Sequence, residues 1–185
     1  INSKTKAIVP VHYGGNPCKI LELSEIAKKN DLLLIEDAAE SLGASVNNKK
    51  VGTIGDSSIF SFCGNKVLTT GEGGAIVTDS KEIYEKIKLI RSHGRMDKIN
   101  YFNNPEQSEY IDIGYNWRMS SITAALGVSQ MSKLKKIIKN RQEHARHISR
   151  GLSNIKGIQV PRSEENSKHI FQMYSILLEN EQIRD

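Results

Sequence analysis

The sequence predicts an α/β fold, and three observations lead to that prediction. A short apolar segment, a segment with helical spacing and a second apolar segment follow one another over residues 7–35. The second apolar segment, Leu32–Ile35, is a continuous run bounded by charged residues, as is typical of a parallel strand buried on both faces. Two more strand candidates follow in the same half of the chain. Because a strand, a helix and a strand in this order form a right-handed crossover unit, we expect a parallel pair at the start of the sheet.

The first elements are justified by turn residues and by helical spacing. Ala7–Val11 is a strand candidate that closes in a turn at Gly14–Pro17, since Gly, Asn and Pro favour turns. A helix is expected over residues 19–30, where apolar residues recur at helical spacing on one face. These residues are Ile20, Leu23, Ile26 and Ala27.

The next elements continue the alternation of strands and helices. Ser58–Phe62 and Gly74–Thr78 are strand candidates, and Glu82–Arg91 returns to helical spacing. Residues 94–117 show no strong period, and a loop of that length in a compact domain is usually functional or disordered.

The second half is dominated by one long helix. It is expected over Ser120–Arg150, capped by its first serines and stopped by Gly151. Two strand-like runs follow, Ile158–Val160 and Ile170–Leu178. They indicate the start of a second, smaller domain.

Composition excludes several classes of protein. The chain has 185 residues, of which 38% are apolar and 25% charged, with a formal net charge of +5. These values are ordinary for a globular protein and exclude a collagen, a disordered tail and a disulfide scaffold. No apolar run approaches the roughly 18 residues of a membrane-spanning helix, so no membrane association is expected. The two cysteines, Cys18 and Cys63, form no CxxC pair, which favours the reducing cytoplasm.

Both ends of the chain look cut. The chain begins at Ile1 rather than Met, and it stops at Asp185 shortly after the apolar run Tyr174–Leu178. We interpret it as an internal piece of a longer protein, with a processed chain as the alternative. In this interpretation residues 1–150 are part of a large domain, and residues 151–185 begin a small one.

Two segments at predicted strand ends carry the candidate chemistry. Glu36–Glu40 follows the buried strand directly, and ligands gather at the carboxyl ends of strands in open α/β sheets. Asp37 therefore stands in a functional position, although a surface charge or a helix cap would look the same. Lys66 lies in an apolar, glycine-bounded segment after the strand Ser58–Phe62, where desolvation would favour the neutral, nucleophilic amine. The alternative for Lys66 is a side chain with no chemical role.

Together, the aspartate and the lysine fit the needs of pyridoxal phosphate. Its aldehyde forms a Schiff base with a lysine amine, and an aspartate beside the ring nitrogen keeps that nitrogen protonated. At an effective dielectric constant near 20, two charges in contact interact by roughly 4 kcal/mol, which is ample for this task. Ser61, five residues before Lys66, could donate to the cofactor phosphate.

A series of motifs resembles one known family. The series runs in order through Val11–His12, Glu36–Glu40, Ser61–Lys66, Thr69–Gly74 and Arg91–Gly94 to Gly114–Met119. It resembles the DegT/DnrJ/StrS family of nucleotide-sugar aminotransferases, over about residues 7–150, and within it most of all the perosamine-synthase group. The tail His169–Leu178 is similar to the start of that family's small domain.

The resemblance implies a fold and a set of roles. The fold would be fold type I of pyridoxal-phosphate-dependent transferases, with a mixed, largely parallel sheet flanked by helices. Lys66 would be the catalytic Schiff-base lysine, Asp37 would pair with the pyridine nitrogen, and Ser61 would hold the phosphate. Glu40 would lie near the ring hydroxyl or the sugar. Asn116 would reach the partner subunit's cofactor phosphate in a homodimer, and Arg118 would line the same shared site, where it would contact the substrate.

The implied activity is that of a sugar transaminase. A keto group on a nucleotide-linked deoxysugar would become an amine, with L-glutamate as the amino donor, and the usual setting is surface-polysaccharide biosynthesis. A lysine at position 66 favours transamination over the family's dehydration, in which histidine takes that place. Cys63 departs from the aromatic residue or histidine that is common in the family. The glycine- and threonine-rich phosphate loop of the family is absent, so the chain alone would hold the cofactor poorly.

The sequence also allows interpretations other than an aminotransferase. A truncated, non-catalytic family member could serve as an interaction or regulatory module, although none of the site residues looks decayed. The basic stretch Lys133–Arg141 could bind nucleic acid, but a solvated helix face is the better interpretation, so no nucleic-acid partner is expected. His144 and His147 lack a third ligand, and no metal site is expected. His12 and His93 are expected to have structural or supporting roles.

Overall fold

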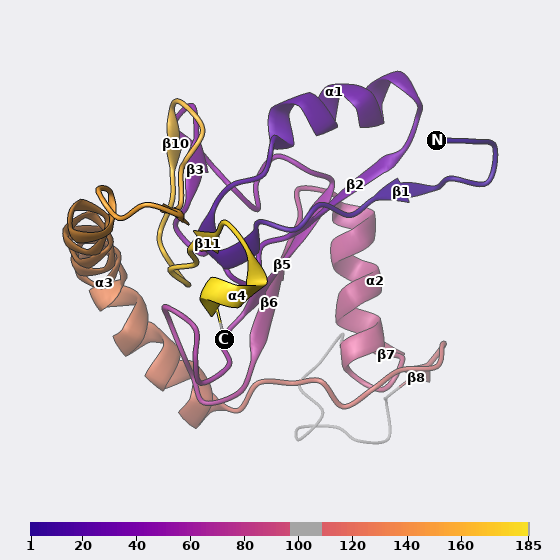
Figure 1. Ribbon diagram of the computed structural model, residues 1–185. Helices are drawn as coiled ribbons and strands as arrows, with labels where there is room; N and C mark the ends of the chain where they lie inside the picture. Colours follow the sequence, from indigo (N-terminus) through magenta and orange to yellow (C-terminus); the bar gives the residue numbers. More distant parts are fainter. Residues whose placement is uncertain (97–108, 185) are drawn as a thin grey trace.

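A mixed four-stranded sheet forms the centre of the fold. The computed structural model describes residues 1–96 and 109–184. The strands are β1 (Ala7–Ile8), β2 (Leu33–Asp37), β5 (Ser57–Ser61) and β6 (Gly74–Val77), and they lie in the order β1-β2-β5-β6. The first two pairs are parallel and the third is antiparallel (Figure 1). The predicted α/β class and the mixed, largely parallel sheet are confirmed.

The first helix packs on the parallel part of the sheet. α1 (Ile20–Lys29) joins β1 to β2, so the predicted strand–helix–strand order is correct. Ile20 and Ala27 of the helix are buried against Leu34 of β2. The helix therefore covers the face of β2 on which Leu34 lies.

The prediction that β2 is buried on both faces is wrong. Leu34 and Glu36 are buried, whereas Leu33 is 51% exposed. Side chains alternate across a strand, so Leu34 and Glu36 lie on one face and Leu33 lies on the other. In the described chain, only the face toward α1 is well covered.

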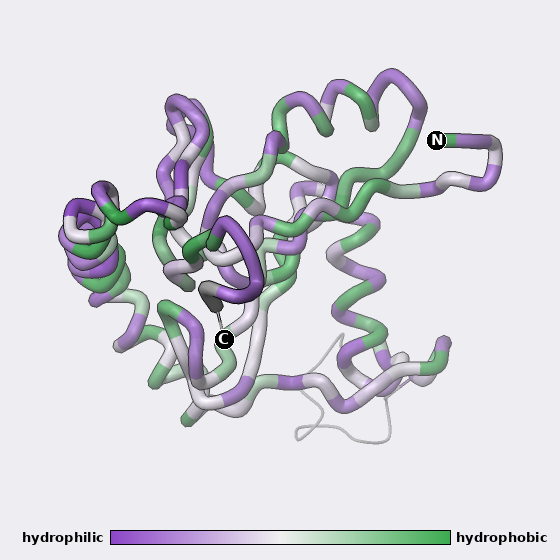
Figure 2. The backbone as a smooth tube through the Cα atoms, in the orientation of Figure 1, coloured by the Kyte–Doolittle hydropathy of each residue, from purple (hydrophilic) through white to green (hydrophobic). Residues whose placement is uncertain are grey.

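The second helix is amphipathic but lightly packed. α2 (Lys81–Arg91) begins after Ser80, whose hydroxyl oxygen accepts a hydrogen bond from the Ile83 amide at 3.3 Å. Apolar and polar residues alternate along it (Figure 2), yet none of its residues is fully buried. The next segment, predicted as a loop over 94–117, contains a short antiparallel pair, β7 (Arg95–Met96) and β8 (Glu109–Tyr110). Residues 97–108 of that prediction lie outside the described residues.

The long helix is confirmed, with a different end. α3 (Ser121–Leu152) is capped by Ser120, whose hydroxyl oxygen accepts a hydrogen bond from the Thr123 amide at 3.1 Å. Gly151 does not stop the helix, which runs through it to Leu152. Glycine ends a helix when it adopts a left-handed conformation just past the last turn, but Gly151 lies inside α3 and the C-cap is Ser153. The first left-handed glycine, Gly157 with φ 83°, comes five residues after the end of α3. In the view of Figure 1, α2 and α3 lie to either side of the sheet. None of the helices in the described part of the chain is long and apolar enough to span a membrane.

The last part of the chain returns to the sheet region. A three-stranded sheet has the order β10-β3-β4, and a two-stranded sheet the order β11-β9. Their strands, with the remaining helices, are β3 (Ser45–Val46), β4 (Lys49–Lys50), β9 (Ile158–Gln159), β10 (Ser167–Lys168), β11 (Leu177–Leu178), the 3-10 helix η1 (Tyr13–Gly15) and α4 (Glu181–Arg184).

The predicted strand over Ile170–Leu178 is wrong except for its last two residues. The Ile170 amide donates to the Gly15 carbonyl at 3.0 Å, and the Met173 amide donates to the Gly14 carbonyl at 3.1 Å. Phe171 between them has φ 52°, which breaks an extended run. This segment docks on the loop after β1 instead of forming a strand. The Ile170 side chain is buried in a core with Ala44, Val51, Val67 and Ile138.

Candidate active site

Strand topology brings Asp37 and Ser61 to one edge of the sheet. β2 and β5 are parallel neighbours, and Asp37 is paired with Ile59, two residues before Ser61. The backbone of Asp37 is held by Pro10, whose carbonyl accepts from the Asp37 amide at 2.9 Å. Its side-chain Oδ1 accepts from the Ala39 amide at 3.1 Å. Both side chains thus follow carboxyl ends of parallel strands, where ligands bind in such sheets.

Lys66 lies in a tight turn that returns to this edge. The Lys66 amide donates to the Cys63 carbonyl at 3.1 Å, and the Thr70 amide donates to the Phe62 carbonyl at 2.9 Å. Gly73, with φ 143°, closes the turn in a conformation that favours glycine. The Lys66 side chain is only 14% exposed, and its Nζ lies 3.3 Å from Oε1 of Glu40. The structure therefore brings Lys66 and Glu40 into direct contact.

Glu40 connects the lysine to the loop after β1. Its second oxygen, Oε2, accepts a hydrogen bond from the Gly14 amide at 2.8 Å. Gly14 has φ 61°, a left-handed conformation that places its amide toward the carboxylate at little conformational cost. Both oxygens of Glu40 are thus engaged, one by a cation and one by an amide, and this fixes the carboxylate beside Lys66.

A buried hydrogen-bonded pair lies on the other face of β2, behind Asp37. Glu36 and His12 are both fully buried, and Oε2 of Glu36 is 3.0 Å from Nε2 of His12. The Cys18 amide donates to Nδ1 of His12 at 3.2 Å, which leaves Nε2 to donate to the carboxylate. Three backbone amides of one loop also donate to Glu36, each at 2.7 Å, namely those of Gly52, Ile54 and Gly55.

These contacts decide the charge of Glu36. Burial by itself would raise the pKa of Glu36, but the hydrogen bonds from His12 and from the three amides outweigh burial and hold the pKa below its ordinary value. The ionised carboxylate therefore ties three chain segments together beneath the candidate site.

Ser61 and Cys63 share a local contact. The Ser61 hydroxyl oxygen accepts a hydrogen bond from the Cys63 amide at 3.3 Å. The Cys63 thiol lies 3.7 Å from Oε1 of Glu72, to which it can donate. The unusual cysteine is thus half-buried at the margin of the turn that carries Lys66.

Asn116 and Arg118 form a separate, exposed group. Arg118 Nε donates to Oδ1 of Asn116 at 3.1 Å, and Nη2 of Arg118 lies 3.5 Å from Nε2 of His93. Among the described residues, no hydrogen bond or ion pair joins either side chain to Lys66 or Glu40. The structure therefore brings Lys66 and Glu40 into contact, places Asp37 and Ser61 at the carboxyl ends of two neighbouring strands, and leaves Asn116 and Arg118 apart from the Lys66–Glu40 pair.

Some residues of the site were missed by sequence reasoning. Gly14 was assigned only to a turn, and Glu36 was passed over as the neighbour of Asp37. Gln172, whose amide contacts the carbonyl of Asn65, carried no signal because 107 positions separate the two residues. The one usable signal was the position of Glu36 directly after the apolar run Leu32–Ile35, where a charged side chain that is buried needs partners.

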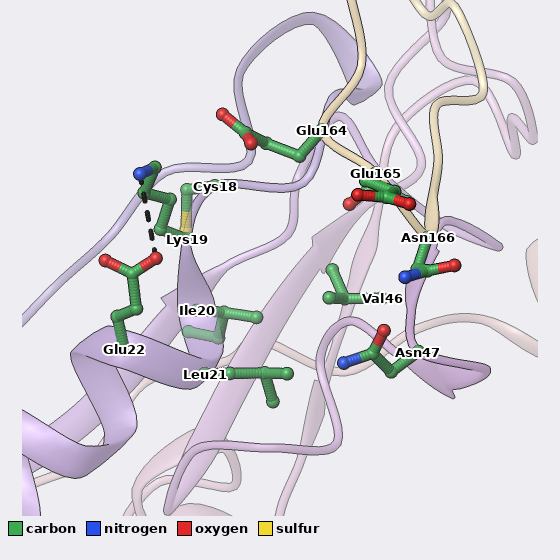
Figure 3. Close-up of a pocket in the computed structure, with 11 residues that line it drawn as sticks. Cys18, Lys19, Ile20, Leu21, Glu22, Val46, Asn47, Glu164, Glu165 and Asn166 are labelled. Atoms are coloured by element: carbon green, nitrogen blue, oxygen red, sulfur yellow. Dashed lines mark ion pairs between the residues drawn. The ribbon is translucent and has the colours of Figure 1, made fainter.

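A hollow elsewhere in the molecule holds none of the predicted site residues. It lies between the start of α1, the turn after β3 and residues 164–167 (Figure 3). Lys19 and Glu22 pair across its rim at 3.6 Å. Within residues 1–96 and 109–184, no three His, Cys, Asp or Glu side chains come together as metal ligands would.

Comparison with known proteins places this geometry in context. A model of the DegT/DnrJ/EryC1/StrS aminotransferase family matches residues 1–185. An uncharacterized protein of Methanocaldococcus jannaschii is 41% identical over 187 residues, which cover 100% of this chain and 48% of that protein. GDP-perosamine synthase of Vibrio cholerae is 38% identical over 181 residues, which cover 98% of this chain and 47% of that enzyme.

A solved structure agrees with the sequence matches. Helicobacter pylori PseC, described as an aminotransferase involved in the biosynthesis of pseudoaminic acid, superimposes with a TM-score of 0.91 at 35% identity. The match covers 100% of this chain and 48% of that chain, so the chain spans about half the length of the relatives it matches. The predicted fold type I is confirmed by this likeness. The chain belongs to the DegT/DnrJ/EryC1/StrS aminotransferase family.

Proposed function

We propose that the protein to which this chain belongs is a pyridoxal-phosphate-dependent aminotransferase that converts a keto group on a nucleotide-linked deoxysugar to an amine. The observation that carries the proposal is the contact between Lys66 and Glu40 at the sheet edge where Asp37 and Ser61 end their strands. The names of the relatives, a GDP-perosamine synthase and a sugar transaminase among them, support the substrate class. L-Glutamate is the amino donor we propose.

The donor set at the sheet edge fits pyridoxal phosphate. The cofactor needs an amine for its aldehyde, a carboxylate for its ring nitrogen and hydrogen-bond donors for its phosphate. Lys66 would supply the amine, Asp37 the carboxylate and Ser61 a hydroxyl. When bound, the cofactor supplies an electron sink that stabilises negative charge on the substrate carbon.

The protein's own residues would divide the remaining tasks. Nζ of Lys66 would be the base that takes a proton from the substrate carbon and later returns it. Glu40 would hold Nζ near that carbon while it carries the proton, because the Glu40 carboxylate is itself fixed by the Gly14 amide. The ionised side chain of Asp37 would keep a positive charge on a ring nitrogen bound beside it.

The wider assembly is also part of the proposal. In a homodimer, Asn116 would reach the phosphate at the partner subunit's site, and Arg118 would line the same shared site toward the nucleotide sugar. Their exposure in this chain is compatible with a role across an interface. We propose that residues 1–150 belong to the cofactor-binding large domain and residues 151–185 to the start of the small one. The two cysteines are free thiols, which is compatible with a reducing cytoplasm.

The test is site-selective labelling. The chain is incubated with pyridoxal phosphate, reduced with borohydride and digested, and the modified lysines are located by mass spectrometry. We expect modification at Lys66 to saturate at a lower cofactor concentration than modification of exposed lysines such as Lys50. The matched control is Lys66→Arg, which keeps the positive charge beside Glu40 but lacks an amine that can bond to the aldehyde. Equal labelling of Lys66 and the exposed lysines, both in this chain and in the full-length protein, would refute the proposal and favour a non-catalytic family member.

A further inference from the structure

Gln172 joins the end of the chain to the turn that carries Lys66. The residue is 91% buried, and its Nε2 donates to the Asn65 carbonyl at 2.7 Å. The Asn65 carbonyl belongs to the peptide bond that leads into Lys66. The hydrogen bond therefore acts directly on the backbone position of the lysine, from a segment more than 100 residues away in the sequence.

The other end of the Gln172 amide has no partner among the described residues. Oε1 is buried and accepts no hydrogen bond. The orientation of the amide is unambiguous, because a carbonyl oxygen such as that of Asn65 can only accept and so must face the NH₂ group. A buried acceptor without a donor costs more free energy than a single neutral hydrogen bond contributes. For stability alone, an apolar side chain of the same length would serve at least as well.

The segment around Gln172 is held from two sides. We call residues 169–173 the strap. From α3, Nη1 of Arg141 donates to the Phe171 and Gln172 carbonyls, each at 3.1 Å, and Gln142 Nε2 donates to the His169 carbonyl at 2.7 Å. The Arg141 side chain is thus part of this framework and not of the solvated basic face that the sequence predicted.

On its inner side, the strap rests on the loop that holds Glu40. Strap amides donate to the Gly14 and Gly15 carbonyls. The approach is close, because a Cβ placed on Gly15 would lie 2.8 Å from the backbone nitrogen of Gln172 and 3.1 Å from the backbone carbonyl oxygen of Glu40. The strap therefore contacts both segments that meet at the Lys66–Glu40 pair. Its backbone contacts the loop after β1, and the Gln172 side chain contacts the turn that carries Lys66.

We propose that Gln172 is a positioning residue for Lys66. Its NH₂ group fixes the Asn65 carbonyl, and this sets the distance between the lysine and the Glu40 carboxylate. The cost of leaving Oε1 without a partner is explained by this task, since sites that break the rules of stability are commonly functional. The inference deepens the proposed function and rests on it for the meaning of Lys66 as the reacting lysine.

The test uses three variants of residues in and around the strap, which differ in the hydrogen bond that each removes. Gln172→Met removes the hydrogen bond to Asn65 together with the unpartnered oxygen, at nearly constant length. Gln142→Met removes an anchor of the same strap that does not touch the Lys66 turn, and so reports the effect of loosening the strap alone. Gln172→Glu keeps the shape of the side chain and replaces the donor by an acceptor, so it tests the same bond if the methionine variant folds poorly.

Two readouts are followed at Lys66. The first needs no cofactor: each protein is treated with a small acylating reagent, and the rate at Lys66 is divided by the rate at exposed Lys50 in the same digest. We expect Gln172→Met and Gln172→Glu to raise this ratio roughly three- to tenfold, the equivalent of one hydrogen bond, with a Tm within about 4 °C of the parent. The second readout is the pyridoxal phosphate concentration that half-saturates Lys66, which we expect to rise by a similar factor. Gln142→Met should leave both readouts unchanged.

The outcomes separate this inference from the proposed function. An unchanged acylation ratio in folded Gln172 variants would overturn the positioning role, as would an equal change in Gln142→Met. If neither the parent chain nor the full-length protein shows selective linkage of pyridoxal phosphate to Lys66 while the acylation ratio still rises in the Gln172 variants, the proposed function fails and the positioning of Lys66 stands.

Discussion

The two groups of predicted site residues are built in different ways. Lys66 and Glu40 are largely buried, and hydrogen bonds that reach across the sequence hold them, from Gly14 to Glu40 and from Gln172 to the Asn65 carbonyl before Lys66. Asn116 and Arg118 are exposed, and their hydrogen bonds stay with each other and with His93.

The neighbours of the exposed group share this character. The rings of Tyr115 and Trp117 stack on one another at 4.1 Å, although both are more than half exposed. The first group thus has its geometry set by buried contacts, whereas the second is tied to residues 90–93 by hydrogen bonds and has its side chains open to solvent. Under the proposed function this difference is expected, because only the second group serves a neighbouring subunit.

The largest effect is expected beneath the buried group, at Glu36. Glu36→Gln removes the charge that accepts from His12 and from three amides, and we expect a loss of about 3 kcal/mol in the free energy of unfolding. Denaturant unfolding at neutral pH measures it, with exposed Glu25→Gln as the control. A loss below that of the control would show that the buried pair does not stabilise the fold.

The same variant should change the pH dependence of stability. The pKa of folded Glu36 lies below its ordinary value of 4.5, so its contribution is present above that value and is lost as the pH falls through the lower, folded pKa. We expect the parent to lose stability steeply below about pH 4.5, and Glu36→Gln to lose correspondingly less. Parallel stability curves for the two proteins would contradict this assignment.

A smaller effect is expected where the strap meets the loop after β1. Gly15→Ala would force a side chain onto a backbone with φ 87° and bring a Cβ within 2.7 Å of Ile170, so we expect destabilisation of about 2 kcal/mol. Gly71→Ala is the matched control, since its φ is 82° but no atom lies within 4 Å of the added Cβ. Hydrogen exchange should show faster exchange in residues 169–173 only in the first variant. Similar destabilisation by both variants would mean that backbone strain alone, and not the strap, decides the effect.

The contact between Glu40 and Lys66 is expected to give an effect on reactivity more than on stability. Glu40→Gln keeps an acceptor for the Gly14 amide and removes the charge beside Lys66. We expect the acylation rate of Lys66, relative to Lys50, to rise roughly two- to fivefold, in line with a partly exposed ion pair. Glu22→Gln, which breaks the exposed pair with Lys19, serves as the control. No change at Lys66 would show that the ion pair does not restrain the lysine.

The smallest effect is expected in the exposed group. Arg118→Ala removes hydrogen bonds to Asn116 and His93 that are open to water, so we expect a change within about 0.5 kcal/mol in the free energy of unfolding. Thermal unfolding of the chain measures it. A loss above about 1 kcal/mol would show that this group belongs to the chain's own core, and the contrast between the two groups would fail.

The site residues found from the sequence are those that local pattern reveals. Asp37 was found because it directly follows an apolar strand, and Lys66 because it lies in a glycine-bounded turn after another. The carboxyl ends of parallel strands meet at one edge of a sheet whatever the details of packing. Asp37 therefore lies at the end of β2, and Lys66 lies in the turn that follows its parallel neighbour β5. The exposure of β2 and the end of α3 were missed because they depend on what covers each face of the strand and on the conformation that Gly151 adopts in the fold.

The sequence by itself determined the α/β class, the order of the main helices and strands and the family. These follow from periodicity and motif order, which are properties of neighbouring residues. Only the tertiary structure decided that Glu40 pairs with Lys66, that Glu36 is buried with His12, and that Gln172 holds the turn before the lysine. Such contacts join residues 24 to 107 positions apart, which only the folded chain brings together. Once these groups are buried, a charge or an amide without a partner costs free energy, and this cost favours the pairs that are seen.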